Sequence, residues 1–296
     1  MQTVTSNIRD VGMSLVDGIA TLLGASAPLR DVNESSSGIV LLGPSHAFAE
    51  LSLEKRRLQS RLSDDHRHFI AVARALLRMQ PDAVQRRIDQ HDDTIREVIE
   101  QTNLVWHSTT GKAMVAVKEA VDGILDAISC LHDPAEGSVV LIPDTNAMII
   151  SPAFQTWSFD GLSEFEILLV PTLLSELDSL KTEHRNPDVR QKAQSVIRQI
   201  KEYRRRGSLS DGVVIVENQI RLCSFAVEPR VDEILPWLNA DSPDDRMLAS
   251  CVEAMRIHPR SMVALVTADI NLQNKAEFAR VPFIEPPSCE ETAVDR

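Results

Sequence analysis

The sequence predicts an α/β domain with a mostly parallel sheet, preceded by an all-α N-terminal module. From about residue 136 onward, short apolar runs alternate with amphipathic helical patterns, which is typical of a parallel sheet covered by helices on both faces. Before that point nearly every apolar pattern has helical spacing. The stretch HDPAEGS, residues 132–138, contains a proline and a glycine and separates the helical patterns from the α/β patterns. We therefore expect a helical module over residues 1–135 and an α/β domain over residues 136–296.

The N-terminal module carries three long helical patterns. Apolar residues recur at three-, four- and seven-residue spacings across residues 51–79, then across residues 88–105, and again across residues 114–128. His66 and His68 lie two positions apart in the first pattern, so they point apart and are expected to be surface side chains, not metal ligands. Arginines and aspartates interleave throughout the module. The sequence leaves open whether it holds RNA, self-associates, binds another protein or is simply a solvated helical surface.

The α/β domain begins with an uninterrupted apolar run at residues 139–142. Such a run suits a strand that is buried on both faces. Further strands are expected at residues 167–170, 213–216 and 262–267, and a weaker one at residues 220–225 is a candidate to pair with its neighbour at 213–216. Helical patterns lie between them, at residues 172–180, 189–205, 243–256 and 272–278.

Composition excludes several classes of protein. The formal net charge of -12, from 43 acids and 31 bases, argues against a non-specific nucleic-acid coat protein. The four cysteines are far apart and form no CxxC pair, so neither a zinc site nor a disulfide framework is expected. Arg9 and Asp10 interrupt the apolar positions of the N-terminus, and no stretch is long enough to cross a membrane. We expect a soluble, cytoplasmic protein without a membrane partner.

Acidic residues follow the predicted strands of the α/β domain. Asp144 directly follows the first strand, Glu176 lies on the first turns of the helix after the second, and Asp269 lies just beyond a later strand. Because the strand-to-helix junctions of a parallel sheet share one edge, we expect these three acids to meet in one cleft. Asp244 and Asp245 lie in the first turn of another helix and join them if that helix is oriented alike.

Crowded carboxylates predict a metal site. They repel one another, and their pKa values rise unless a cation is present. Oxygen ligands without nearby histidine or cysteine favour Mg²⁺ or Mn²⁺. Such an ion activates a water and neutralises charge at a phosphate under attack. The chemical hypothesis is metal-dependent hydrolysis of a phosphodiester.

Four stretches within residues 138–287 contain these acids: IPDTNAMI, VPTLLSELDSLK, SPDDRMLASC and LVTADINLQNKA. In sequence and in order they resemble the PIN domain, a nuclease fold shared by toxin ribonucleases and RNA-decay endonucleases. ELDSLK and TADINLQNKA are similar to the pattern of the large-PIN subgroup. The resemblance implies a three-layer PIN-like fold and a metal-dependent endoribonuclease that cleaves single-stranded RNA.

The resemblance also implies roles for single residues. It assigns catalytic, metal-binding carboxylates to Asp144, Glu176, Asp245 and Asp269, with Asp244 as an auxiliary ligand. Asp245 is favoured over Asp244 because it aligns with the family's single aspartate ahead of an apolar helix. Substrate-positioning roles fall to Asn146, Thr267 and Asn271. Two bases close behind Glu176, Lys181 and Arg185, are placed for substrate contact.

Ordinary explanations exist for each acid taken alone. Asp144 suits a turn, Asp269 suits a helix cap, and Asp244 and Asp245 suit a helix dipole worth a few tenths of a kcal/mol to about one each. All of them occurring in the family's order favours the metal site.

Two other functions stay open. Phosphatases of the dehalogenase type also place an acid after their first strand, but they need a second aspartate two residues later, where this chain has Asn146. A regulatory protein that binds RNA without cutting it would have the same fold. The basic run KEYRRRGS, residues 201–208, suits either RNA phosphates or the solvated end of a helix.

Overall fold

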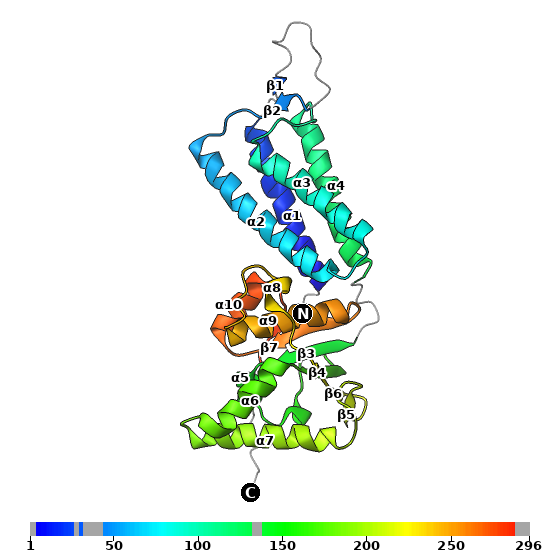
Figure 1. Ribbon diagram of the computed structural model, residues 1–296, viewed down its shortest axis with the longest axis vertical. Coiled ribbons are helices and arrows are strands. Elements are labelled where there is room, and N and C mark those ends of the chain that lie inside the picture. Colours follow the sequence, from blue (N-terminus) through cyan, green and yellow to red (C-terminus); the bar gives the residue numbers. More distant parts are fainter. Residues whose placement is uncertain (1–3, 27–29, 32–43, 132–137, 288–296) are drawn as a thin grey trace. The chain divides into compact units, whose positions relative to one another are not determined.

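A computed structural model describes residues 4–26, 30–31, 44–131 and 138–287. Its internal contacts divide the chain into a helical unit, residues 5–131, and an α/β unit that takes in residues 138–287 (Figure 1). Among the helices that the structure describes, none is both long and apolar enough to span a bilayer.

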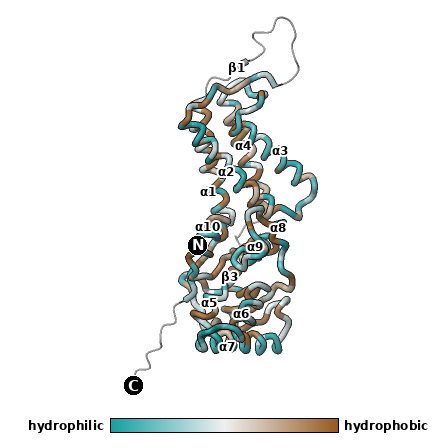
Figure 2. Tube along the Cα trace, turned by 60° about the vertical axis from the view of Figure 1, so that its left-hand side comes forward, coloured by the Kyte–Doolittle hydropathy of each residue, from teal (hydrophilic) through white to brown (hydrophobic). Residues whose placement is uncertain are grey.

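Four long helices build the described part of the helical unit: α1 (Val4–Ala25), α2 (Leu53–Leu77), α3 (Asp82–Glu100) and α4 (Thr110–Ser129). Ser52 and Thr109 cap α2 and α4, each accepting a hydrogen bond from the backbone N–H three residues later. β1 (Arg30–Asp31) and β2 (His46–Ala47) form a two-residue antiparallel pair that the helical spacing did not predict. Polar and apolar residues alternate along the helices in Figure 2, as expected for helices that each bury one face.

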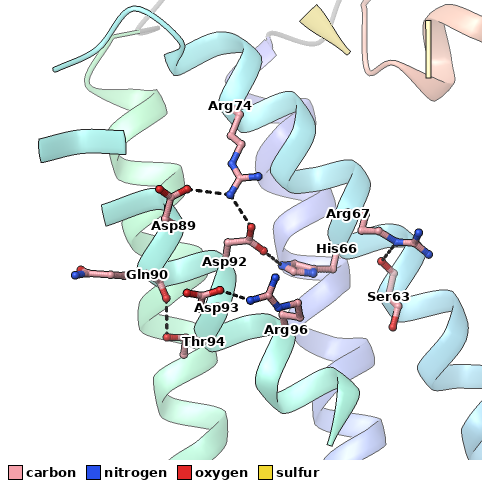
Figure 3. A network of polar contacts seen from close by, with 10 residues as sticks. All are labelled: Ser63, His66, Arg67, Arg74, Asp89, Gln90, Asp92, Asp93, Thr94 and Arg96. Carbon is pink, nitrogen blue, oxygen red and sulfur yellow. Dashed lines mark hydrogen bonds and ion pairs between the residues drawn. The ribbon is translucent and has the colours of Figure 1, made fainter. Parts of the chain in front are cut away.

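A buried polar contact between α2 and α3 overturns the expectation that His66 is a surface residue. His66 is only 3% exposed, and its Nε2 lies 3.1 Å from a carboxylate oxygen of Asp92 (Figure 3). Arg74 contacts the other Asp92 oxygen at 2.7 Å and Asp89 at 2.9 Å. Burial opposes ionisation of Asp92, but His66, Arg74 and Arg96 outweigh it and lower the pKa of Asp92. Helical spacing places His66 and His68 on different sides, and one of those sides faces the core.

A sheet in the order β5-β6-β4-β3-β7-β8 forms the centre of the described α/β unit. Its strands are β3 (Val139–Pro143), β4 (Phe165–Leu169), β5 (Val213–Val216), β6 (Ile220–Ser224), β7 (Met262–Val266) and β8 (Phe283–Ile284). Neighbouring strands are parallel except β5 and β6, which form an antiparallel hairpin at the edge. The predicted mostly parallel sheet is confirmed, whereas the two-residue β8 was not predicted.

Helices cover both faces of this sheet, with α5 to α7 on one side and α8 to α10 on the other (Figure 1). Their bounds are α5 (Thr145–Ile150), α6 (Pro171–Glu183), α7 (Pro187–Arg204), α8 (Val231–Ile234), α9 (Pro243–Ile257) and α10 (Ile270–Phe278). A short 3₁₀ turn, η2 (Phe154–Thr156), follows α5. Proline at the first position starts α6, α7 and α9, where its missing N–H has no partner to lose.

The register of two central strands positions the residues that follow them. β3 and β7 pair in parallel with Pro143 opposite Val266, so Asp144 and Thr267 leave the sheet side by side. The backbone N–H of Asp144 extends the pairing by donating to the carbonyl of Val266 at 3.0 Å. The sheet thus fixes the relative positions of two predicted site residues before any side-chain contact is considered.

Candidate active site

A pocket of about 520 Å³ lies at the carboxyl ends of β3 and β7, where α5 and α10 begin. Five of the ten predicted site residues line it: Asp144, Asn146, Glu176, Asp244 and Asp269. The remaining lining residues come from α5, α6, α9 and α10: Thr145, Ser175, Ser179, Leu180, Pro243, Arg246, Met247 and Leu272. The other five predicted residues lie outside this lining, and each is placed below.

Asp144 is deeply buried at the base of the pocket, with 5% of its surface exposed. Its Oδ1 accepts the N–H of Ala147 at 2.6 Å and caps α5, and its Oδ2 accepts the hydroxyl of Thr267 at 2.5 Å. Burial raises the pKa of Asp144 to about 6, and the charges of Asp269 and Glu176 add to the rise against the two hydrogen bonds. The repulsion between neighbouring carboxylates that the sequence predicted therefore contributes to the raised pKa of Asp144.

Thr267 connects Asp144 to Asp269. It is fully buried, and its hydroxyl accepts the backbone N–H of Asp269 at 3.0 Å while donating to Asp144. Asp269 in turn caps α10, with Oδ1 accepting the N–H groups of Asn271 at 2.8 Å and Leu272 at 3.3 Å. Thr267 thus orients one acid of the pocket, whereas the exposed Asn271 contributes a backbone group to the cap.

Glu176 faces the pocket from α6 and has a partner that the sequence analysis missed. The hydroxyl of Thr145, the residue after Asp144, donates a hydrogen bond to the Glu176 carboxylate. Thr145 is buried, at 8% exposure, and its hydrogen bond to Glu176 links α5 to α6. Its position directly after the acid in DTN was the available signal.

A lysine from α10 bridges the two aspartates of α9. Lys275 Nζ lies 2.8 Å from Asp245 Oδ1 and 3.2 Å from Asp244 Oδ2. The other Asp245 oxygen accepts the backbone N–H of Asn239 at 2.9 Å. Burial opposes ionisation of Asp245, but the bonds from Lys275, Asn239 and Ser242 outweigh it and lower the pKa of Asp245. Asp245 is 9% exposed and fully engaged, whereas Asp244 lines the pocket.

The two predicted basic residues do not line the pocket. Lys181 forms an ion pair with Asp178 on its own helix, and Arg185 is exposed in the turn after α6. Arg246, which the sequence analysis missed, lines the pocket and contacts Glu228 at 3.2 Å. Its signal was its place directly after the two aspartates.

The donor set of the pocket suits a hard divalent cation. Carboxylate and hydroxyl oxygens line it together with the amide of Asn146, and neither cysteine nor histidine is among its lining residues. Within the described ranges, no three histidine, cysteine or carboxylate side chains lie close enough to hold one ion as they stand. Asp144, Glu176 and Asp245 each bond to an internal partner, and binding one ion would require the acids of the pocket to move closer together.

Comparison with known families adds an independent finding. The PIN domain family model matches residues 141–285, a range that contains every predicted site residue. It confirms the resemblance inferred from the four sequence stretches and the α/β fold expected for this half of the chain. A comparison with curated proteins found no significant match.

Proposed function

We propose that this chain, of which residues 141–285 match the PIN domain family model, is a metal-dependent endoribonuclease that hydrolyses phosphodiester bonds of single-stranded RNA. PIN domains are typically nucleases of this kind. The observation that carries the proposal is the shared pocket of Asp144, Glu176, Asp244 and Asp269, in which Asp144 has a pKa raised to about 6 by burial and by its acidic neighbours. We propose RNA over DNA as the substrate because of the resemblance to the family. We propose the cytoplasm as the place of action because of the spacing of the cysteines.

The proposed metal ligands are the four acids assigned from the resemblance, Asp144, Glu176, Asp245 and Asp269, with Asp244 as an auxiliary. A bound Mg²⁺ or Mn²⁺ supplies water activation and charge neutralisation at the phosphate. Thr145 and Thr267 hold Glu176 and Asp144 in place through their hydroxyls. Because Asp244 lines the pocket and Asp245 bonds to Lys275, both members of the pair need testing.

Substrate contacts are proposed at the rim. Asn146 is exposed and lines the pocket, and Asn271 is exposed at the start of α10. Lys181 and Arg185 follow Glu176 along α6 and its end, where they would meet phosphates of a strand leaving the pocket.

A second candidate is a protein of the same fold that binds RNA without cutting it. The bridge from Lys275 to Asp244 and Asp245 favours this candidate, because a fixed ammonium group partly neutralises the acids that a metal would need.

Cleavage of an end-labelled single-stranded RNA by the full chain in Mn²⁺ or Mg²⁺ tests the proposal. EDTA and the variants Asp144→Asn, Asp244→Asn and Asp245→Asn should abolish or strongly reduce internal cuts. Asp160→Asn removes an exposed carboxylate of the same unit outside the pocket and should cut like the wild type. Equal cutting by Asp144→Asn would indicate a contaminating ribonuclease. Binding without cutting by folded wild-type protein would favour the second candidate.

A further inference from the structure

Helix α7 carries a concentration of positive charge in an acidic chain. Residues 187–206, which are α7 and the two residues after it, contain seven bases and two acids, whereas the whole chain has a net charge of -12. Local charge of this sign is what an anionic partner recognises on an otherwise acidic protein.

Three of these bases form one exposed face of α7. Arg198, Lys201 and Arg205 are three and four residues apart, so they lie above one another on the helix surface and span about 10 Å along its axis. All three are exposed. The opposite side of α7 is buried through Ala193, Val196, Ile200 and Tyr203. We call Arg198, Lys201 and Arg205 the α7 basic face.

Among the residues that the structure describes, the α7 basic face has no acidic partner, whereas several other exposed bases of the chain pair with a carboxylate. Arg67, Arg96 and Arg230 each pair with a carboxylate two or three positions away. In the part of the chain that the structure describes, none of the three bases of the α7 basic face forms an ion pair or a side-chain hydrogen bond. In a chain with 43 acids against 31 bases, such pairing would be easy to provide.

The helix dipole explains only part of this arrangement. Bases at the last turn of a helix gain a few tenths of a kcal/mol to about one from the dipole, and the effect fades beyond that turn. Arg198 lies more than a turn from the end of α7. Like charges three and four residues apart also repel, which costs roughly 0.2–0.5 kcal/mol per pair. This repulsion offsets part of the dipole stabilisation of Lys201 and Arg205, and an anion bound to the face would relieve it.

We propose that the α7 basic face binds the phosphate backbone of the single-stranded RNA that enters the acidic pocket. This inference rests on the proposed function. Helix α6 connects the two places, because Ser175, Glu176 and Ser179 line the pocket and α6 packs against α7. A strand that leaves the pocket across α6 reaches α7, where three cations offset three phosphate charges without reading sequence.

The test measures binding of a labelled single-stranded RNA in EDTA, so that no cutting occurs. The full chain carrying Arg198→Gln, Lys201→Gln and Arg205→Gln is compared with the wild type over a range of salt. Losing three phosphate contacts should reduce the slope of log affinity against log salt by about 2, and weaken binding at 0.1 M salt by about 100-fold. The control carries Arg57→Gln, Arg61→Gln and Arg86→Gln, which remove the same charge from exposed bases of the helical unit.

Equal losses in the two triple variants, or an unchanged slope in the α7 variant, would overturn the inference. Loss of binding to anionic lipid vesicles with RNA binding intact would also overturn it, in favour of a lipid surface. Cleavage distinguishes this result from failure of the proposed function. If the wild type cuts RNA and the α7 variant binds it normally, the nuclease stands and the α7 basic face does not. If nothing cuts but the α7 variant alone loses RNA binding, the face stands and the nuclease does not.

Discussion

At the scale of single residues, Asp144 combines a structural and a chemical role. It caps α5, extends the pairing of β3 and β7, and lines the acidic pocket. These roles conflict, since the burial that fixes its position also raises its pKa from 3.8 to about 6. The folded protein therefore binds a proton at Asp144 more tightly than the unfolded chain does.

This difference in proton binding predicts how stability depends on pH. Between the two pKa values the folded state holds more protons than the unfolded state, so the contribution of Asp144 to stability is full below pH 3.8 and falls until about pH 6. At 1.36 kcal/mol per pKa unit the loss is about 3 kcal/mol. Asp144→Asn has no such loss. Without metal, its free energy of unfolding should therefore rise relative to that of the wild type between pH 4 and pH 7. Urea denaturation of both proteins in EDTA measures this difference, and a difference that stays constant with pH would contradict the expectation.

Lys275 gives a second prediction at this scale. Its ammonium group lies among the acids of α9 and raises the cost of placing another cation there. Replacing it in Lys275→Met should tighten Mn²⁺ binding by about tenfold, or roughly 1.4 kcal/mol. Lys275→Arg keeps the charge and should bind Mn²⁺ like the wild type. Isothermal titration calorimetry decides; weaker binding by Lys275→Met would mean that the lysine orients Asp245 for the metal.

At the scale of elements, the contact between α2 and α3 depends on how deeply its carboxylates are buried. The Asp92 side chain is 13% exposed and contacts both His66 and Arg74, whereas Asp89 is 62% exposed and contacts Arg74. Removing one partner of a buried charged contact leaves the other unpaired. Asp92→Asn should therefore lower the stability of the helical unit by about 1–3 kcal/mol.

Asp89→Asn is the matched control on the same helix and against the same arginine. An exposed ion pair contributes about 0–1 kcal/mol, so this variant should unfold close to the wild type. Thermal unfolding of both variants checks the comparison. Equal effects would show that burial does not strengthen the contact.

The sequence predicted the elements that have a strong local signal. The apolar run of β3 and the long periodic patterns of α2 and α9 need no distant information, and the structure contains all three. β8 and the β1–β2 pair were missed because each strand has two residues, too few to show a period. Their pairing depends on strands that are distant in the sequence, and a local pattern carries no information about those strands.

The same limit applies to the candidate site. Asp144 and Asp269 were predictable because each directly follows a strand, and Asp244 because it opens a helix. Lys275 lies thirty positions after Asp245 and meets it only because α9 and α10 pack together. The expectation for His66 was wrong for a related reason, since helical spacing shows that two side chains diverge but not which side faces the core.

At the scale of the whole molecule, every predicted site residue lies in one unit. The residues from Asp144 to Asn271 all belong to the α/β unit, which has its own sheet and core. The family match, residues 141–285, also stays within it. The helical unit has a separate core and its own buried contact at His66.

We therefore expect a fragment of residues 136–296 to fold alone and to cut single-stranded RNA with the kcat of the full chain. A unit with its own hydrophobic core can fold independently, and the proposed catalytic groups need no residue from outside it. Circular dichroism and cleavage of the same labelled RNA check the two parts of this expectation. The fragment with Asp144→Asn serves as the inactive control.

A folded fragment that cuts only after residues 1–135 are added would contradict this expectation, because the helical unit would then contribute directly to the reaction. If the fragment keeps kcat but has a higher KM, the helical unit increases affinity for RNA, and its interleaved arginines become the residues to replace.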